Sequence, residues 1–369
     1  MFAIVWCELL LQIGIFYWSG KNFSSFQPYV WSPYGLVRNN PKFTSPAFHI
    51  NSNGFREVRE YTQEKPPNTV RVILLGGSVL YSGLGGIPIP GITRVSSEQT
   101  ISQYLTKELQ NSPPCIGKKI EVINAAVNFN RMSEIVPAYL NDYINWDADL
   151  VIVGSSLNNF AGGITQTSKL LGGHPWEAEF QRLVNDSGMA SSLEVIVRRL
   201  SENLASLGVA RKFVTKMISH IEPKRVYPSN RPMEETNTDR LNQKNLEKFE
   251  NYASAMLSAA KTRNQNISFF WEHDLWNSAS FKPFSKEEVV LGKLNPPMIN
   301  PFYWQQLNWL NDFSKEKNVG FIDPKPEMTN YQPTIFIDYG HYTAGGNEFM
   351  AKVMANRIVG KDTCLASRK

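Results

Sequence analysis

The stretch Thr69–Leu75 (TVRVILL) runs directly into Gly76-Gly77-Ser78. A short, mostly apolar run that ends at glycines is typical of a strand buried on both faces of a parallel sheet. More runs of this kind follow along the chain, at residues 119–125 (KIEVINA), 149–153 (DLVIV), 266–271 (NISFFW) and 319–322 (VGFI). The sequence therefore predicts a sheet of short, buried strands.

Helical patterns alternate with these strands. They cover residues 96–110, 133–146, 191–221, 238–262, 301–317 and 344–359. The first begins with Ser96 at the capping position, and the second contains Pro137, which we expect in its first turn. Strands and helices that alternate at this spacing form βαβ units. The sequence therefore predicts an α/β fold with a mainly parallel sheet.

Composition limits the classes of function. The chain has 369 residues, of which 42% are hydrophobic and 19% charged, so it is able to bury a sizeable core. Lys and Arg exceed Asp and Glu by 38 − 33 = 5 without forming a basic run, and we expect no nucleic-acid partner. Cys7, Cys115 and Cys364 are too few for a disulfide framework, and no His/Cys cluster has metal-ligand spacing. We expect no metal and no cofactor. Cys115 and Cys364 are free to pair if the domain is exported or to stay reduced if it is not.

The N-terminal segment, residues 1–20, is mostly apolar. Residues 2–18 reach the short limit for a membrane-spanning helix, although Glu8 and Gln12 interrupt them. A membrane anchor is the favoured interpretation, and a buried or interfacial helix and a cleaved signal peptide stay open. Lys21 is the first positive charge, so the positive-inside rule alone argues weakly against export of the domain that follows.

Three parts of the chain are expected. The apolar segment 1–20 is followed by a connector, residues 21–68, which is rich in Pro, Ser, Asn and aromatic residues and which we expect to pack on the domain. The domain occupies residues 69–369 and contains a helical insertion at about 165–262. Gly83-Leu84-Gly85-Gly86 lacks the Lys-Ser/Thr of a phosphate-binding loop, and we interpret it as a flexible active-site loop.

Four polar residues follow predicted strands or precede a predicted helix. In an open parallel sheet, functional groups gather at the carboxyl ends of the strands. Ser78 follows the first strand, Asn158 follows the third, and Asp338 and His341 lie just before the last helix. A serine nucleophile needs a base, a carboxylate that orients the base, and donors for the oxyanion. Each residue alone is more often a cap or a turn residue, but together they supply the parts of an acyl-transfer site.

The same segments resemble the SGNH (GDSL-like) hydrolases in four ordered blocks: VILLGGSVLYSG (72–83), VINAAVNFN (122–130), DLVIVGSSLNNF (149–160) and FIDYGHYTAGGNEFMAKVM (336–354). The last block is the most specific, because Asp-x-x-His is followed by Thr-x-x-Gly-Asn and an apolar helix. Residues 50–78 also resemble the entry to bacterial SGNH proteins with an N-terminal membrane segment. The resemblance implies a three-layer α/β/α sandwich with a mainly parallel five-stranded sheet.

Carried over by position, the resemblance implies roles for these residues. Ser78 would be the nucleophile, His341 the general base and then acid, and Asp338 its orienting partner. Asn158 and the backbone N–H of Ser78 would donate to the oxyanion.

The sequence departs from the family's pattern at three positions. The Asp that usually precedes the serine is Gly77. The block-two glycine, an oxyanion donor through its N–H, falls at Asn128 or Phe129, and a backbone N–H needs no glycine unless φ is positive. The block-three glycine before the asparagine falls at Ser156.

The function expected from these features is a serine esterase, in particular a carbohydrate O-deacylase or deacetylase at the cell envelope. Its substrate would be an acylated carbohydrate or a lipid ester. Two alternatives stay open: a lipid esterase or acyltransferase on the same residues, and a non-catalytic binding or assembly subunit with the same fold. His273, at the end of the fourth strand, is a secondary candidate for a substrate contact. The resemblance implies a domain outside the cytoplasm.

Overall fold

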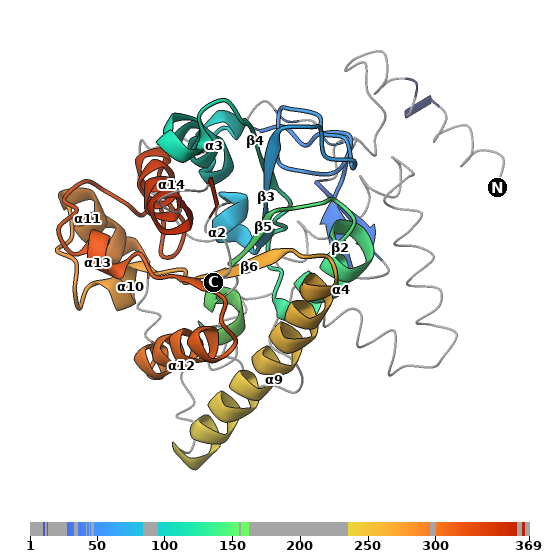
Figure 1. Ribbon diagram of the computed structural model, residues 1–369. Coiled ribbons are helices and arrows are strands. Elements are labelled where there is room, and N and C mark those ends of the chain that lie inside the picture. Colours follow the sequence, from blue (N-terminus) through green and yellow to red (C-terminus); the bar gives the residue numbers. More distant parts are fainter. Residues whose placement is uncertain are drawn as a thin grey trace.

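The predicted parallel sheet is confirmed. The computed structural model describes residues 10, 11, 13, 28–32, 36–41, 43, 45, 48–83, 95–154, 156–161, 235–295, 300–359, 364 and 365. Its five-stranded sheet has the order β4-β3-β5-β6-β7, and every neighbouring pair is parallel (Figure 1). The strands are β3 (Thr69–Gly76), β4 (Lys119–Asn124), β5 (Leu150–Gly154), β6 (Asn266–Phe270) and β7 (Gly320–Ile322). When the five strands are numbered in the order in which they occur along the chain, their order in the sheet is 2-1-3-4-5, which is a doubly wound order.

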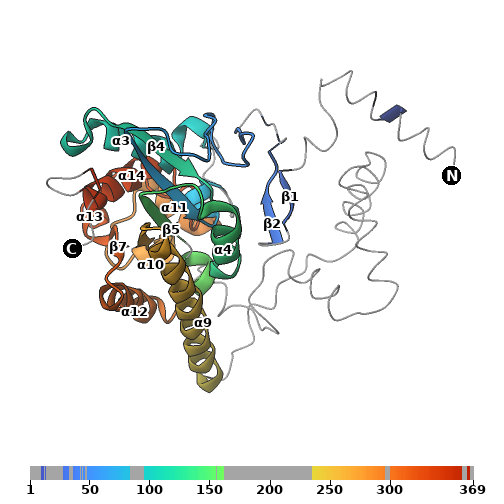
Figure 2. The ribbon, with the colours of Figure 1, turned by 45° about the vertical axis from the view of Figure 1, so that its right-hand side comes forward.

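Helices cover both faces of the sheet, as Figures 1 and 2 show. One face carries α3 (Ile101–Asn111), α10 (Leu275–Ser278), α11 (Lys286–Leu294), α13 (Lys325–Met328) and α14 (Ala344–Ile358). The other carries α4 (Met132–Ala138), α9 (Glu235–Thr262) and α12 (Tyr303–Glu316). Residues of β3 alternate between the two cores: Val72 and Leu74 face the first layer, Ile73 and Leu75 the second. The architecture is therefore a three-layer α/β/α sandwich.

Two predicted helices differ from the expectation in an informative way. Pro137 lies near the end of α4 rather than in its first turn, and a wider π-helical turn at Tyr139–Tyr143 follows. Proline lacks the N–H of the helical ladder and crowds the preceding turn, which accounts for the early end of the regular helix. The described part of the predicted insertion is α9, whose Phe249, Ala253 and Met256 are buried against the sheet. Residues 235–262 are thus a helix of the second layer, and the rest of the predicted insertion lies outside the described residues.

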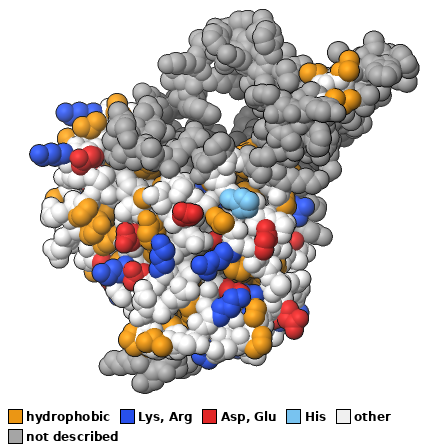
Figure 3. Space-filling model, turned by 90° about the horizontal axis from the view of Figure 1, so that it is seen from above, with side chains coloured by type: hydrophobic (Ala, Val, Ile, Leu, Met, Phe, Trp, Pro, Cys, Tyr) orange, Lys and Arg blue, Asp and Glu red, His pale blue; other side chains and the backbone are white. Residues whose placement is uncertain are grey.

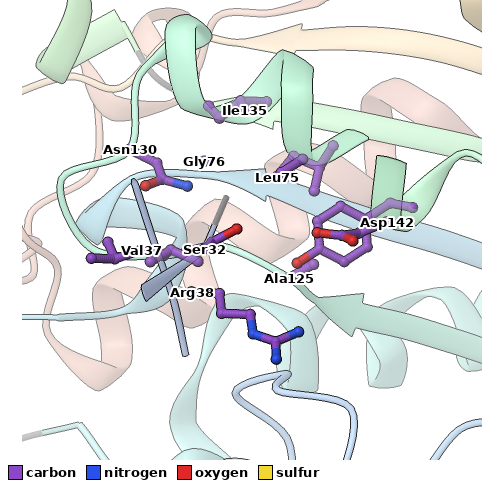
Figure 4. Close-up of a pocket in the computed structure, with 12 residues that line it drawn as sticks. Ser32, Val37, Arg38, Leu75, Gly76, Ala125, Asn130, Ile135 and Asp142 are labelled. Carbon is purple, nitrogen blue, oxygen red and sulfur yellow. The ribbon is translucent and has the colours of Figure 1, made fainter. Parts of the chain in front are cut away.

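A two-stranded hairpin precedes the sheet. Its strands, β1 (Tyr29–Ser32) and β2 (Leu36–Asn39), are antiparallel. Asn39 Nδ2 donates to the Ala126 carbonyl at 3.0 Å, so the described part of the connector contacts the domain. Between hairpin and sheet lies a small cavity of about 10 Å³, room for about one water molecule. Figure 4 shows that Ser32 and Val37 line it opposite residues of β3 and of the loop after β4.

The surface and the N-terminal segment show fewer features that bear on function. On the face in Figure 3, basic, acidic and apolar side chains of the described residues are interspersed. None of the helices within the described ranges is long and apolar enough to cross a membrane. Of the predicted membrane segment 2–18, only Leu10, Leu11 and Ile13 are described, and their side chains are exposed.

Cys115 and Cys364 form a disulfide across 249 residues of sequence. Cys115 is buried beside the first core, and Cys364 follows α14. Cross-linking restricts the unfolded chain, so we expect Cys364→Ser to lower the free energy of unfolding by about 2–4 kcal/mol. Urea titration of the non-reduced proteins measures this, with Cys7→Ser as the control. Equal midpoints for Cys364→Ser and the wild type would show that the disulfide contributes nothing.

Candidate active site

The candidate site lies where the strand order reverses. β3 pairs with β4 on one side and β5 on the other, and the crevice beyond the carboxyl ends of such strands is where doubly wound folds bind ligands. Gly76 of β3 opposes Gly154 of β5. A Cβ on Gly76 would lie 2.2 Å from the Gly154 carbonyl oxygen, so only glycine allows the two backbones to approach this closely. This approach brings the loops after β3 and β5 together.

Ser78 opens the four-residue helical turn α2 (Ser78–Tyr81), directly after the glycines. Its Oγ lies 2.7 Å from Nε2 of His341, which follows it by 263 residues. Both residues are buried. Nδ1 of His341 lies 2.8 and 2.9 Å from the two carboxylate oxygens of Asp338. Because the carboxylate accepts from Nδ1–H, Nε2 is left as the acceptor for the serine hydroxyl, which is the arrangement of a general base.

The loop that carries Asp338 and His341 is fixed by its own backbone. Oδ1 of Asp338 accepts the N–H groups of Gly340 and His341 at 2.9 and 2.8 Å. The Ile337 N–H donates to the His341 carbonyl at 2.8 Å and closes the turn. The loop is tied to α11 by Glu288, whose carboxylate accepts the Ile335 N–H at 2.9 Å. These bonds orient the carboxylate and the imidazole before any substrate binds.

The Thr-x-x-Gly-Asn segment after this loop has a structural explanation. Thr343 caps α14 by accepting the Gly346 N–H at 2.9 Å. A Cβ on Gly346 would lie 2.3 Å from the Ile335 carbonyl oxygen, so this position requires glycine. Asn347 Nδ2 donates to the Gln99 carbonyl at 3.0 Å, just before α3. The motif therefore fixes the start of α14, and with it His341, against the residues just before α3 in the same helical layer.

Asn158 reaches the site from the loop after β5. Its Nδ2 donates to the Asn130 carbonyl at 3.0 Å, which leaves its second N–H to point elsewhere. The Asn158 amide also fills the space beside the nucleophile: a Cβ on Gly77 would lie 2.0 Å from its nitrogen. This contact explains why glycine stands at position 77. The structure thus brings together Ser78, His341, Asp338 and Asn158, all named from the sequence.

The segment where the family pattern has its block-two glycine has an unusual backbone conformation in this chain. Phe129 has a φ of 70°, in the left-handed region that favours glycine, and its side chain is 43% exposed. The neighbouring Asn128 Oδ1 would lie 2.7 Å from a Cβ on Gly83, and the Asn130 carbonyl 3.1 Å from one on Gly77, so the loop runs along the turn that carries Ser78. Phe129 therefore adopts a left-handed backbone conformation that costs a residue with a side chain about 1–2 kcal/mol.

A buried carboxyl that the sequence did not single out lies under the loop after β5. Glu272 is almost fully buried, and its Oε2 accepts the Leu157 N–H at 3.0 Å. Oε1 has no hydrogen-bond partner among the described residues. Burial raises the pKa of Glu272 to about 8, and the Leu157 bond opposes this rise in part. A glutamate directly after the apolar run 269–271 (FFW), without a nearby cation, was the available signal in the sequence.

This pKa predicts a pH dependence of stability. The folded protein holds the Glu272 proton up to about pH 8, whereas the unfolded chain loses it near the ordinary value of 4.5. The contribution to the free energy of unfolding is fully present below pH 4.5 and is lost as the pH rises through 8, on the order of 4 kcal/mol in all. We expect Glu272→Gln to show a smaller decline than the wild type in urea titrations from pH 5 to pH 9; part of the decline remains, because burial also raises the pKa of Glu57 to about 7. Glu64→Gln, at an exposed site, is the control, and parallel profiles for Glu272→Gln and the wild type would contradict the assignment.

His273 does not turn its side chain to the site. Its ring is fully buried, with Nε2 2.7 Å from Asp323 Oδ1 and Nδ1 in contact with the Tyr303 hydroxyl. Both ring nitrogens are therefore occupied, and the expectation of a substrate contact from this side chain was wrong. The backbone that follows β6 does lie near the site, because the His273 carbonyl accepts the hydroxyl of Tyr342, the residue after His341, at 3.2 Å.

These features define a class. A doubly wound sheet with a serine after its first strand, an asparagine after its third and an Asp-x-x-His loop before its last helix is the arrangement expected of the SGNH (GDSL-like) hydrolases. The described residues of this chain have that arrangement.

The comparisons with known proteins give distant structural likenesses. No family model matches the chain, and no curated protein matches it in sequence. An acetylxylan esterase from Geobacillus stearothermophilus has a TM-score of 0.41 at 12% identity, over 81% of this chain and 97% of its own. Another acetyl xylan esterase has a TM-score of 0.41 at 13% identity, over 78% and 98%. A protein assigned as a GDSL-like lipase from Parabacteroides merdae has 0.40 at 11%, over 78% and 94%.

Proposed function

We propose that this chain is a serine esterase that removes acyl groups from carbohydrates at the cell envelope. The observation that carries the proposal is the continuous set of hydrogen bonds from Ser78 Oγ through the His341 imidazole to the Asp338 carboxylate. Ser78 and the loop that carries Asp338 and His341 are far apart in sequence, and the three side chains are buried together. Such a set activates a serine for attack on an acyl carbon.

The geometry defines the steps. Ser78 Oγ forms a bond to the ester carbonyl carbon while His341 Nε2 takes the hydroxyl proton. The resulting oxyanion is stabilised by Asn158 Nδ2–H and the backbone N–H of Ser78. The C–O bond to the alcohol then breaks, and His341 returns the proton to the leaving oxygen. Water, deprotonated by His341, hydrolyses the acyl-enzyme, which frees the acid and restores the Ser78 hydroxyl.

The surroundings of the nucleophile favour a carbohydrate ester over a long-chain lipid. The side-chain amides of Asn128 and Asn158 lie beside the serine turn, and amide groups suit the hydroxyls of a sugar. Phe129 adds an exposed aromatic ring at the same place. Sites with convergent polar groups beside an aromatic face are typical of small polar ligands. A lipid esterase or acyltransferase on the same residues is distinguished by a substrate panel of acetylated sugars and long-chain esters.

A location outside the cytoplasm is part of the proposal. The Cys115–Cys364 disulfide supports it, because such bonds persist in oxidising compartments. The apolar N-terminal segment, in which Leu10, Leu11 and Ile13 are exposed, supports attachment to a membrane. Protease protection on intact cells tests the side on which the domain lies.

Fluorophosphonate labelling tests the proposed chemistry directly. The reagent reacts with an activated serine hydroxyl, so purified protein is expected to be labelled and the Ser78→Ala protein is not. Absence of labelling in wild-type protein that unfolds cooperatively would refute catalysis and would favour the non-catalytic binding subunit.

A further inference from the structure

Ser156 and Glu272 face each other at the carboxyl ends of β5 and β6. The Glu272 N–H donates to Ser156 Oγ at 2.7 Å. In return, Glu272 Oε2 accepts the Leu157 N–H at 3.0 Å. Ser156 and Glu272 are 3% and 1% exposed, so water does not compete for these bonds. The two bonds run in opposite directions between the same two segments: Ser156 accepts from Glu272, and Glu272 accepts from Leu157.

We propose that this reciprocal pair, the Ser156–Glu272 clamp, positions Asn158 for oxyanion stabilisation. The inference rests on the proposed esterase function. Ser156 and Glu272 are positioning residues here, because their bonds end on the loop and not on the reacting atoms.

The clamp explains the departure from the family at block three. Where relatives carry glycine before the asparagine, this chain carries Ser156, whose hydroxyl accepts the Glu272 N–H. A glycine would leave that buried N–H without this acceptor, at a cost of about 1–3 kcal/mol. The serine therefore supplies the acceptor for the backbone N–H two positions beyond β6, and the Glu272 side chain supplies the acceptor for the second bond.

The packing around the Glu272 carboxyl confines it to one position. A Cβ on Gly154 would lie 3.1 Å from Glu272 Oε1 and 2.8 Å from the Leu80 side chain. Gly154 thus leaves space for the carboxyl under the loop, and Leu80, from the turn that carries Ser78, bounds that space. The carboxyl is held between the β5 loop and the nucleophile's own turn.

Asn158 directly follows Leu157, whose N–H the clamp holds through Glu272. On its other side its amide is held by the Asn130 carbonyl at 3.0 Å. The clamp fixes the backbone and Asn130 fixes the side chain, so the remaining N–H of the amide has one direction. Oxyanion stabilisation depends on a donor that is placed before the reaction, and a small displacement of it lowers the rate.

The test is a double-mutant cycle measured as kcat for p-nitrophenyl acetate. Removing a whole oxyanion donor costs roughly 10²–10³ in rate, and we expect Glu272→Leu, which removes the acceptor for Leu157, to cost about 10-fold to 100-fold. Glu272→Gln keeps an acceptor oxygen and is expected to restore most of the rate. In an Asn158→Ala background, Glu272→Leu is expected to cost less than about threefold, because the donor that it positions is gone.

A purely structural role gives a different result. If Glu272→Leu lowers kcat by the same factor with and without Asn158, the clamp does not act through Asn158 and the inference is overturned. An undiminished rate in Glu272→Leu overturns it as well. Should Glu272→Leu not fold, Ser156→Ala removes the other bond of the clamp and enters the same cycle with the same expectations. Failure of the esterase proposal is recognised separately, because the wild type would then show neither turnover nor fluorophosphonate labelling.

Discussion

Replacing Ser78 by alanine is expected to lower kcat for p-nitrophenyl acetate by on the order of 10⁶, the size of effect that loss of a triad serine has. Ser78 Oγ is the atom that lies 2.7 Å from His341 Nε2, and alanine leaves no group for His341 to deprotonate. The backbone N–H of residue 78 and Asn158 remain, so substrate is still able to bind. We therefore expect kcat to collapse while KM changes little.

Ser82→Ala is the matched control for this prediction. Ser82 ends the same short turn that Ser78 begins, and its side chain is also buried. Its loss removes a hydroxyl from the same turn without touching the His341 bond, so we expect its kcat to stay within about threefold of the wild type. A Ser78→Ala protein that retained a tenth of the wild-type rate would show that another group attacks the ester.

Replacing Asp338 by asparagine is expected to lower kcat by about 10⁴. The amide oxygen is able to accept the Gly340 and His341 backbone N–H groups, so the loop keeps its shape. The amide nitrogen, however, donates to His341 Nδ1 and selects the tautomer whose Nε2 carries the hydrogen. That tautomer is unable to accept the Ser78 proton. Loss of rate without loss of fold is therefore the expected signature, and circular dichroism with kcat measures both.

The protein contains its own control for this substitution. His273 and Asp323 form a second imidazole–carboxylate pair, 2.7 Å apart, that does not touch Ser78. We expect Asp323→Asn to weaken folding while kcat stays within about threefold of the wild type. Equal losses of rate in Asp323→Asn and Asp338→Asn would mean that the Asp338 variant acts through stability alone.

Strong local patterns made the sheet and the triad predictable. The apolar runs at 69–75 and 149–153 lie within or overlap β3 and β5, because strands buried on both faces carry almost no polar residues. The Asp-x-x-His and Thr-x-x-Gly-Asn spacings were readable because each position has a local task, from orienting the imidazole to capping α14. Ser78, Asp338, His341 and Asn158 follow from those two kinds of signal.

Features that depend on distant partners were not predictable. The hairpin β1–β2 has four residues in each strand, too few for a period to show against the aromatic-rich connector. His273 was assigned to the site because it follows β6, but Tyr303 and Asp323, far along the chain, turn its ring away. Glu272 was passed over because its partners, Ser156 and Leu157, are set by the register of β5 and β6 and not by spacing in the sequence.

The 263 residues between nucleophile and base also have a consequence for biosynthesis. At roughly 5–20 residues per second, the ribosome takes about 13–50 s to pass from Ser78 to His341. Throughout this interval the nascent chain carries the serine without its base and is chemically silent. Cys364 is synthesised later still, so a chain that terminates between residues 341 and 364 would possess the triad but not the covalent closure. The base of the proposed catalytic serine and the partner of Cys115 are therefore both added late in synthesis, in that order.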